Sequence, residues 1–485
     1  MFLALICICN NPIQRTERSL PVRLKNSKIH DRINGNLEIK FTAEKLTSFS
    51  GLELFNRYFR AIKLKEIITG FFKNAGIGGD YKVSELVLTF MSLWLTGGNR
   101  LRHIRYLSGD FLIKRICGVK KLATERTLSR WLKRFTPKTI AALNALNSCL
   151  VLQSLRVLEL ARITLNFDGT VISTGDDVEN AARGYNPHKK FSKSYYPFLC
   201  HITQTGHFFQ VKNRRGNIHD SKGGALTMIA DSIRQVRDAL GKKLIIEIRL
   251  DSAFFSEKIL RFLIKSKVLF AVKMPLWKWT GAKELINNRQ RWERASNDLS
   301  YFETEIELKK WKLKVPVVIY RKCLTKNNLK PKNFQLDLFD PGDGIYEYQV
   351  VATNQKLEAK NALDFYNGRC VMEREIAEIK QEYVFANIPT KNYNANSAYQ
   401  AISIFAHTLV KNFQMTTNQV TKRNKNSSRT GTFSFESLKS LRFKIIARAG
   451  RVVNQSGKSV LKLVDEPAER KEFEKIAFEL DQLVA

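Results

Sequence analysis

The strongest constraint on the fold is a change in the spacing of apolar residues near Leu160. Across residues 42–150 the apolar positions recur at helical intervals, whereas later apolar runs are short and rich in β-branched and aromatic residues. Strands are expected at 162–167, 195–203, 208–212 and 244–250, and helices at 221–240 and 256–265. The pattern predicts a helical domain followed by an α/β domain.

A strand-rich stretch interrupts the α/β pattern. An apolar run at 268–274 ends at Pro275, and the next clear strand is expected at 346–353. Four of the six tryptophans lie between them, which indicates a β-rich insertion rather than a linker: Trp277, Trp279, Trp292 and Trp311. Helices are expected again at 359–382 and 397–413. The predicted domains are 1–150 (helical), 151–275 and 346–415 (two parts of an α/β core), 276–345 (β-rich insertion) and 416–485 (a small C-terminal segment).

The chain is strongly basic. It has 485 residues, with 81 Lys and Arg against 45 Asp and Glu, and 44% of its residues are hydrophobic. The apolar content is sufficient for packed cores and excludes a disordered protein. A formal charge of +36 predicts a polyanionic partner, for which nucleic acid is the first candidate.

Composition also restricts cysteine chemistry and membrane insertion. Seven cysteines are scattered without a CxxC motif, so neither a disulfide framework nor a zinc site is expected from them, and a reducing compartment is indicated. Residues 1–9 are apolar but lack a basic flank and a small-residue cleavage site, so we interpret them as a buried segment or an early start rather than a signal peptide. No membrane span is expected.

Basic residues concentrate in the N-terminal region. Residues 100–138 hold 12 Lys and Arg against Asp110 and Glu125. Within them, 124–135 predicts a short capped helix with outward cations: Arg126, Arg130, Lys133 and Arg134. This helix either belongs to a helix-turn-helix that enters a major groove or is a solvated basic helix.

Two further segments have unusual charge. Residues 183–222 carry eight basic residues against Asp220, interleaved with aromatic residues. Contacts with a duplex backbone are predicted for Lys189, Lys190, Arg214 and Arg215, while most of the rings are assigned to the core. At the C-terminus, residues 411–462 are basic and 465–481 are acidic, which indicates a DNA-contact or inter-subunit surface followed by a packing or partner helix.

Two aspartates follow predicted strands. Asp168 ends the segment ITLNF at 163–167, and Asp251 ends LIIEIRL at 244–250. The carboxyl ends of parallel strands form the usual ligand side of an α/β sheet, so the two side chains are expected to converge. The alternative is that each aspartate caps a helix or forms a turn.

A third acid belongs to a helical stripe. At 100° per residue, Tyr366, Arg369, Glu373 and Lys380 fall within about 60° of arc, and Cys370, Ile376 and Ala377 share the stripe. We expect this side to face protein, where charges are costly without a ligand or partner. A salt-bridged helical face is the alternative.

The three acids together suit hard cations. Mg²⁺ prefers oxygen ligands and is commonly held by few carboxylates together with phosphate oxygens of the substrate. Paired ions can activate the attacking hydroxyl and stabilise the leaving oxygen in phosphodiester chemistry. Asp168, Asp251 and Glu373 are therefore the predicted metal ligands and catalytic residues.

Read together, these residues resemble the DDE transposases of bacterial insertion sequences, in the cut-and-paste group with a Y-x2-R-x3-E-x6-K signature. Tyr366, Arg369, Glu373 and Lys380 match all four positions. The segments NFDGT at 166–170, GYNPHKK at 184–190 and RGN at 215–217 are similar to one branch of that group. The resemblance covers roughly 163–413.

The resemblance implies an RNase H-like core with a β-rich insertion before the Glu373 helix, and a helical N-terminal domain that recognises DNA. It implies two Mg²⁺ ions, with Mn²⁺ as a substitute, bound by Asp168, Asp251 and Glu373. In such enzymes the signature Arg and Lys contact phosphates near the cleaved end and the Tyr helps to hold that end, which assigns these roles to Arg369, Lys380 and Tyr366. A tryptophan of the insertion commonly stacks on a flipped base, and all four tryptophans there are candidates.

The expected function is cleavage of terminal inverted repeats and transfer of the freed 3′-hydroxyls to target DNA. A homodimer on double-stranded DNA, in the bacterial cytoplasm at the nucleoid and without a membrane, is expected. Two alternatives remain: a DNA-binding regulator that lacks catalysis, and a metal-dependent nuclease without strand transfer.

Overall fold

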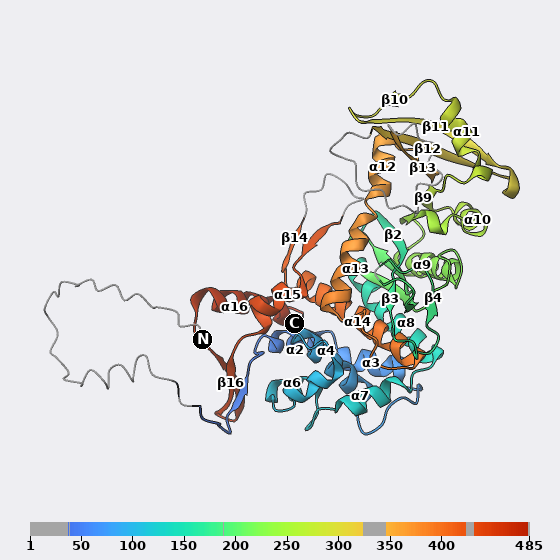
Figure 1. Ribbon diagram of the computed structural model, residues 1–485. Coiled ribbons are helices and arrows are strands. Elements are labelled where there is room, and N and C mark those ends of the chain that lie inside the picture. Colours follow the sequence, from blue (N-terminus) through green and yellow to red (C-terminus); the bar gives the residue numbers. More distant parts are fainter. Residues whose placement is uncertain (1–36, 38, 188, 324–345, 423–430, 484–485) are drawn as a thin grey trace, which may run out of the picture. The chain divides into compact units, whose positions relative to one another are not determined.

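A nine-stranded mixed sheet organises the part of the chain that the structure describes (Figure 1). The structure is a computed structural model, and it describes residues 37, 39–187, 189–323, 346–422 and 431–483. The apolar segment at 1–9 lies outside the described residues. Along the sheet the strands are β10 (Glu293–Arg294), β11 (Leu299–Leu308), β12 (Leu313–Cys323), β13 (Tyr346–Thr353), β9 (Leu269–Met274), β8 (Ile245–Leu250), β2 (Arg162–Gly169), β6 (Phe198–Ile202) and β7 (Phe208–Lys212).

The centre of the sheet is parallel. β2 pairs in parallel with β8, and β8 pairs in parallel with β9, while β6 and β7 join the other side of β2 as antiparallel strands. The predicted strand at 195–203 is divided, because Pro197 lacks an N–H group and separates β6 from β5 (Lys193–Tyr195). The other predicted strands form at nearly the expected residues, which confirms the α/β assignment.

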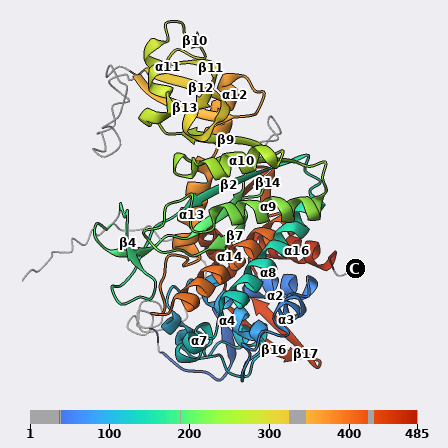
Figure 2. The same ribbon diagram turned by 90° about the vertical axis from the view of Figure 1, so that its right-hand side faces the viewer.

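Alternation along the central strands gives the sheet two different sides. Ile163, Leu165 and Phe167 of β2 belong to the same core cluster as Ile248 of β8. Helices α9 (Ala225–Leu240) and α10 (Glu257–Lys265) cover this apolar side with their own buried residues (Figure 2). The intervening side chains of β2 and β8 are polar, so the opposite side of these two strands is polar although it is buried.

The strand-rich stretch extends this sheet. β13 pairs antiparallel with β9, from Val350 opposite Met274 to Thr353 opposite Ala271, and β10, β11 and β12 continue outward from β13. The predicted strands are thus present, and they continue the central sheet. One of their faces shares the apolar core of the central strands, and the other packs with residues 359–366 in a smaller core. The part of the predicted insertion at 324–345 lies outside the described residues.

The N-terminal helices share one core with helices from the C-terminal half. These helices are α2 (Leu52–Ala61), α3 (Leu64–Phe72), α4 (Val83–Leu95), α6 (Phe111–Cys117), α7 (Glu125–Leu132) and α8 (Pro137–Val157). They pack with α13 (Cys370–Glu382), α14 (Tyr393–Thr416), α15 (Leu438–Leu441) and α16 (Pro467–Asp481). One example is Phe55 of α2, whose ring stacks on Phe413 of α14 with centroids 4.0 Å apart.

Two long helices cross predicted domain borders. α8 runs through the border at 150/151, and α14 runs through the border at 415/416. By length and composition α8 is apolar enough to cross a bilayer. Its buried Leu143, Leu146 and Leu150 instead join the core shared with α14, which accounts for its apolar character.

The C-terminal segment combines a small sheet with the acidic helix. β1 (Lys45–Thr47), a strand that the helical reading of 42–150 did not predict, pairs with β16 (Gly450–Gln455), which pairs with β17 (Lys458–Leu463). The acidic helix α16 contacts the basic segment of its own chain, with Lys444 Nζ 2.7 Å from Glu472 Oε1 and Arg448 Nη1 2.8 Å from Glu469 Oε1. Ion pairs within the chain therefore neutralise part of the positive charge of the C-terminal segment.

One of the predicted helices is divided into two helices in the structure. The segment expected to be helical at 359–382 forms α12 (Ala359–Asn367) and α13, separated at Gly368 and Arg369. A Cβ atom at residue 368 would overlap the guanidinium of Arg249, so only glycine allows this close approach of the helix junction to β8. The break decides where Arg369 and Glu373 lie.

The central sheet provides a direct stability test. We expect Ile248→Ala to lower the free energy of unfolding by about 2–5 kcal/mol, because Ile248 is fully buried between β2 and β9. Ile245→Ala, in the same strand but 38% exposed, should cost less than about 1 kcal/mol. Urea unfolding of both variants measures the difference, and equal losses would contradict the assigned alternation.

Candidate active site

Asp168 and Asp251 lie side by side at one edge of the sheet. The parallel register of β2 and β8 ends with Phe167 opposite Leu250, and each aspartate is the next residue. Asp168 Oδ1 accepts a hydrogen bond from Gly169 N at 2.9 Å, and Asp251 Oδ1 accepts one from Ala253 N at 2.6 Å. Asp251 thus caps the short 3₁₀ turn Ser252–Phe254, so both readings of this residue hold.

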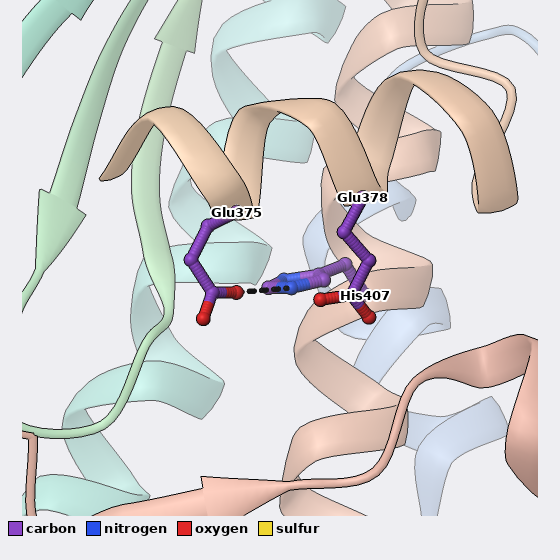
Figure 3. A group of neighbouring side chains, drawn as sticks. All are labelled: Glu375, Glu378 and His407. Carbon is purple, nitrogen blue, oxygen red and sulfur yellow. Dashed lines mark ion pairs between the residues drawn. The ribbon is translucent and has the colours of Figure 1, made fainter. Parts of the chain in front are cut away.

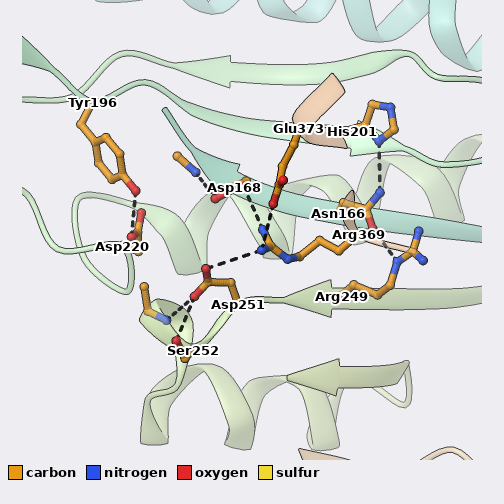
Figure 4. A network of polar contacts seen from close by, with 12 residues as sticks. Asn166, Asp168, Tyr196, His201, Asp220, Arg249, Asp251, Ser252, Arg369 and Glu373 are labelled. Atoms are coloured by element: carbon orange, nitrogen blue, oxygen red, sulfur yellow. Dashed lines mark hydrogen bonds and ion pairs between the residues drawn. The ribbon is translucent and has the colours of Figure 1, made fainter. Parts of the chain in front are cut away.

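Glu373 reaches the same place from helix α13, and a single cation joins the three acids (Figure 4). Arg369 Nη1 donates to Asp168 Oδ2 at 2.9 Å. Arg369 Nη2 lies 3.4 Å from Glu373 Oε1 and 3.8 Å from Asp251 Oδ2. The structure therefore brings together the three predicted acids and one of the two signature cations.

Burial changes the acid–base properties of this group. The pKa of Asp168 is raised to about 7 by burial, against the attraction of Arg369 and with repulsion from Asp251. For Arg369, burial lowers the pKa, but the neighbouring Asp168, Tyr366 and Asp251 outweigh it and hold the pKa above its ordinary value. Arg369 is therefore a permanent positive charge among carboxylates, and Asp168 is the acid that titrates near neutrality.

A buried polar network lies next to the three acids, on the polar side of the central strands. Arg249 is 2% exposed; its Nε donates to Asn166 Oδ1 at 2.7 Å and its Nη1 donates to Phe365 O at 2.7 Å, while Nη2 donates to Thr203. Asn166 Nδ2 in turn lies 3.1 Å from His201 Nδ1. Because Phe365 is in α12, Arg249 fixes the end of that helix against the central strands, immediately before the junction that carries Arg369.

A fourth acid adjoins the site. Tyr196 donates to Asp220 Oδ2 at 2.9 Å, and Arg214 Nη2 lies 3.1 Å from Asp220 Oδ1. A Cβ atom at Gly169 would overlap the Tyr196 ring, so the glycine after Asp168 allows this ring to pack beside the strand end that carries Asp168. Asp220 is not among the predicted site residues, and its usable signal in the sequence is that it is the lone acid among the eight cations of 183–222.

The other predicted DNA contacts fall into two groups. Arg214 and Tyr366 are buried, and the Arg214 guanidinium is bonded to Asp220 and to the Tyr196 carbonyl, a placement that favours a structural role. Lys380 is half-buried and donates to Val171 O at 3.1 Å. The exposed residues are Lys189 and Lys190, in the loop before β5, Arg215, and Arg126 and Arg130 on α7.

The stripe on α13 faces protein only in part. Tyr366 and Ile376 are buried and Arg369 and Lys380 are partly buried, whereas Glu373, Cys370 and Ala377 are exposed. Glu375 and Glu378, on the other side of the helix, are turned toward α14. The expectation of a protein-facing stripe therefore holds for the signature Tyr, Arg and Lys but not for Glu373.

The tryptophans in and beside the outer strands of the sheet pack mostly against other aromatic side chains. Trp279 and Trp311 contact each other with ring centroids 4.8 Å apart, and Trp292 packs on Phe302 at 4.8 Å. Trp277 stacks on Trp279 at 5.7 Å and is 41% exposed. Trp277 is thus the exposed member of this group, and the other three tryptophans are half-buried.

The three acids fit a divalent cation by chemistry and by charge. They offer only oxygen ligands, and the space among them already accommodates a cationic group, the Arg369 guanidinium. In the structure these oxygens are paired with the Arg369 guanidinium, and among the described residues a compact group of possible metal-ligand atoms occurs elsewhere. Ion binding at the three acids therefore requires Arg369 to leave.

Competition between Arg369 and metal is measurable. Arg369→Gln should lower the dissociation constant for Mn²⁺ by about 30-fold, because removing one positive charge about 4 Å from a divalent ion relieves about 2 kcal/mol of repulsion in a water-like dielectric. Arg234→Gln, at an exposed side chain of α9, removes an equal charge and should leave the dissociation constant for Mn²⁺ unchanged. Isothermal titration without DNA makes the comparison, and weaker binding by Arg369→Gln would instead mean that Arg369 organises the acids for the ion.

Mn²⁺ binding should also depend on pH near neutrality. Asp168, with a pKa of about 7, takes up a proton as the pH falls below 7, and that proton competes with the ion. The dissociation constant should therefore rise by about fivefold between pH 7 and 6, and level off near pH 8. The same titration at several pH values tests this, and a constant affinity from pH 6 to 8 would show that Asp168 is already ionised.

Comparison with known proteins identifies the family. Residues 30–485 match the family described as transposase DDE domain group 1. No match was found among curated proteins. Among solved structures the chain is similar to a piggyBac transposase synaptic complex with hairpin DNA, determined by cryo-electron microscopy, at 12% identity over 92% of this chain and 88% of that chain, with a TM-score of 0.39. Because the family match spans most of the sequence, the chain belongs to the transposase DDE domain group 1 family.

Proposed function

We propose that this transposase cuts the ends of a mobile DNA element and joins the freed 3′-hydroxyls to target DNA. The observation that carries the proposal is the meeting of Asp168, Asp251 and Glu373 around one cation at the carboxyl edge of parallel strands. A formal charge of +36 supports DNA as the partner. An insertion sequence of a bacterium remains the proposed source, and the nucleoid the proposed location.

We further infer an RNase H-like core. The order β7, β6, β2, β8, β9 has three antiparallel strands followed along the chain by two strands parallel to the first of them. Asp168 follows the first strand and Asp251 the fourth. This topology supports the core expected from the resemblance, with Glu373 supplied by a helix after the extended strands.

In the proposed mechanism the three acids bind the metal ions that activate the reacting groups. Asp168, Asp251 and Glu373 would hold two Mg²⁺ ions, which supply activation of the attacking hydroxyl and stabilisation of the leaving oxygen. Water first attacks the phosphorus at the element's end: a new P–O bond forms, the P–O3′ bond breaks, and the 3′-oxygen leaves with a proton. That 3′-hydroxyl then attacks a target phosphodiester in the same way.

The cations of the site would hold the DNA. Once divalent ions occupy the acids, the Arg369 guanidinium is free to bind a phosphate beside the scissile bond. Lys380 lies on the same helix and on the side of Asp168, where its ammonium can contact the same strand. Lys189, Lys190 and Arg215 are exposed and extend the proposed backbone contact, and Arg126 and Arg130 of α7 are proposed for the inverted repeat.

Transfer of two ends to one target favours a homodimer on DNA, and we propose this assembly. The two rival functions, a regulator without catalysis and a nuclease without transfer, differ from a transposase in their products. A single experiment therefore separates all three.

The test is cleavage and joining of a labelled duplex that carries the element's terminal repeat, with Mg²⁺ or with EDTA. Wild type should give metal-dependent cleaved and joined products, and Glu373→Gln should lower both by at least about 10²-fold while binding the duplex normally. Glu382→Gln, at the other end of α13, is the matched control and should remain active.

Three results would contradict the proposed function or the proposed role of Glu373. Cleavage without joining supports the nuclease, and tight binding without cleavage in Mg²⁺ or Mn²⁺ supports the regulator. Normal activity of Glu373→Gln would remove Glu373 from the mechanism.

A further inference from the structure

A second cluster of ionisable side chains lies on the other side of α13, away from the catalytic acids (Figure 3). Glu375 and Glu378 extend from α13 toward His407 of the neighbouring helix α14. One ligand atom from each of these three residues lies within 4.8 Å of the others. Glutamates three positions apart occupy one face of a helix, so both carboxylates point at the same histidine.

His407 has an unusual environment. It is fully buried, and Nδ1 has no hydrogen-bond partner among the described residues. Nε2 faces Glu375 Oε2 at 3.6 Å (Figure 3), a polar contact longer than an ordinary hydrogen bond, and the ring is held between Phe208 and Tyr383, with centroids 5.4 and 5.1 Å away. A buried imidazole with one unpaired nitrogen and one long contact is costly, which indicates that a better partner is missing at this position.

The charges of the cluster leave room for a cation. Burial lowers the pKa of His407 to about 4, so the ring is neutral and keeps a lone pair for coordination. Burial raises the pKa of Glu378 to about 7, and above that value two carboxylates face one ammonium. That ammonium is Lys411 Nζ, 3.1 Å from Glu375 Oε2.

We propose that Glu375, Glu378 and His407 bind one divalent transition-metal ion, of the zinc class, between α13 and α14. One imidazole and two carboxylates form a set that Zn²⁺ accepts, and imidazole disfavours Mg²⁺ relative to such ions. The arrangement of two helices that each contribute ligands to a buried ion is common in helical bundles. The site would join the helix that carries Glu373 to the core helix α14, and it does not depend on the proposed transposition chemistry.

Lys411 is the main competitor for this position. In the structure its ammonium partly neutralises Glu375, and it also lies 4.1 Å from the centre of the Phe435 ring. Lys411, Glu375 and Glu378 border a cavity of about 200 Å³. When an ion binds, Lys411 can turn into this cavity and keep its contact with the Phe435 ring, and water can fill the open coordination positions.

The experiment is a titration of the metal-free full-length protein at pH 8 with Co²⁺, followed by visible absorption, and then with Zn²⁺ in competition. The wild type should bind one Zn²⁺ that displaces Co²⁺ from an imidazole-containing site. His407→Ala and Glu378→Gln should each weaken Zn²⁺ binding at least tenfold. Glu378→Gln keeps the side-chain volume, so it tests the site even if His407→Ala does not fold.

Two control variants separate this site from the catalytic acids. Asp251→Asn and Glu373→Gln should retain the Zn²⁺, and His219→Ala should retain it because His219 is exposed and lies outside the cluster. The proposal is overturned if folded wild type binds no Zn²⁺, which would leave Glu375 and Lys411 as an internal ion pair. It is also overturned if binding survives Glu378→Gln but is lost in Asp251→Asn, because the ion then sits at the catalytic acids.

Discussion

The requirement to satisfy a buried arginine determines how the site is built. Arg249 lies on the polar side of β8, almost fully enclosed, and burial lowers its pKa to about 10. An enclosed guanidinium is tolerated only when its N–H groups are bonded. Asn166 on the adjacent strand, Thr203 beyond β6 and the carbonyl of Phe365 in α12 satisfy it together. These bonds fix the sheet edge and the helix junction relative to each other, and the positions of Asp168, Asp251 and Glu373 depend on both.

Part of this arrangement could be predicted from sequence. Asp168 and Asp251 come at the carboxyl ends of strongly apolar segments, and the carboxyl ends of parallel strands lie at the same edge of a sheet. The Tyr366 to Lys380 spacing points to the third acid. The alternation of Thr164 and Asn166 with Ile163 and Leu165 is also present in the sequence, but it does not reveal that these polar side chains form a network beneath the acids, because their partners lie on other elements.

Long-range packing explains what the sequence did not reveal. The break between α12 and α13 depends on the approach of Arg249 to Gly368, a contact between residues more than a hundred positions apart. The burial of Glu375 depends on α14, which no local pattern on α13 predicts. Likewise, strands rich in tryptophan suggested a separate module, and only the β13–β9 pairing shows that they continue the central sheet. The charged C-terminal segments also meet through tertiary packing, because the acidic helix α16 forms ion pairs with basic residues of its own chain.

We propose that Asp168, Asp251 and Glu373 hold divalent ions after Arg369 has withdrawn from them. Anomalous X-ray scattering from crystals of the full chain bound to end DNA and soaked in Mn²⁺ tests this most directly. We expect anomalous peaks in contact with all three carboxylates and an Arg369 guanidinium moved to a phosphate. Fully occupied Mn²⁺ elsewhere, with Arg369 still paired to Asp168, would contradict it.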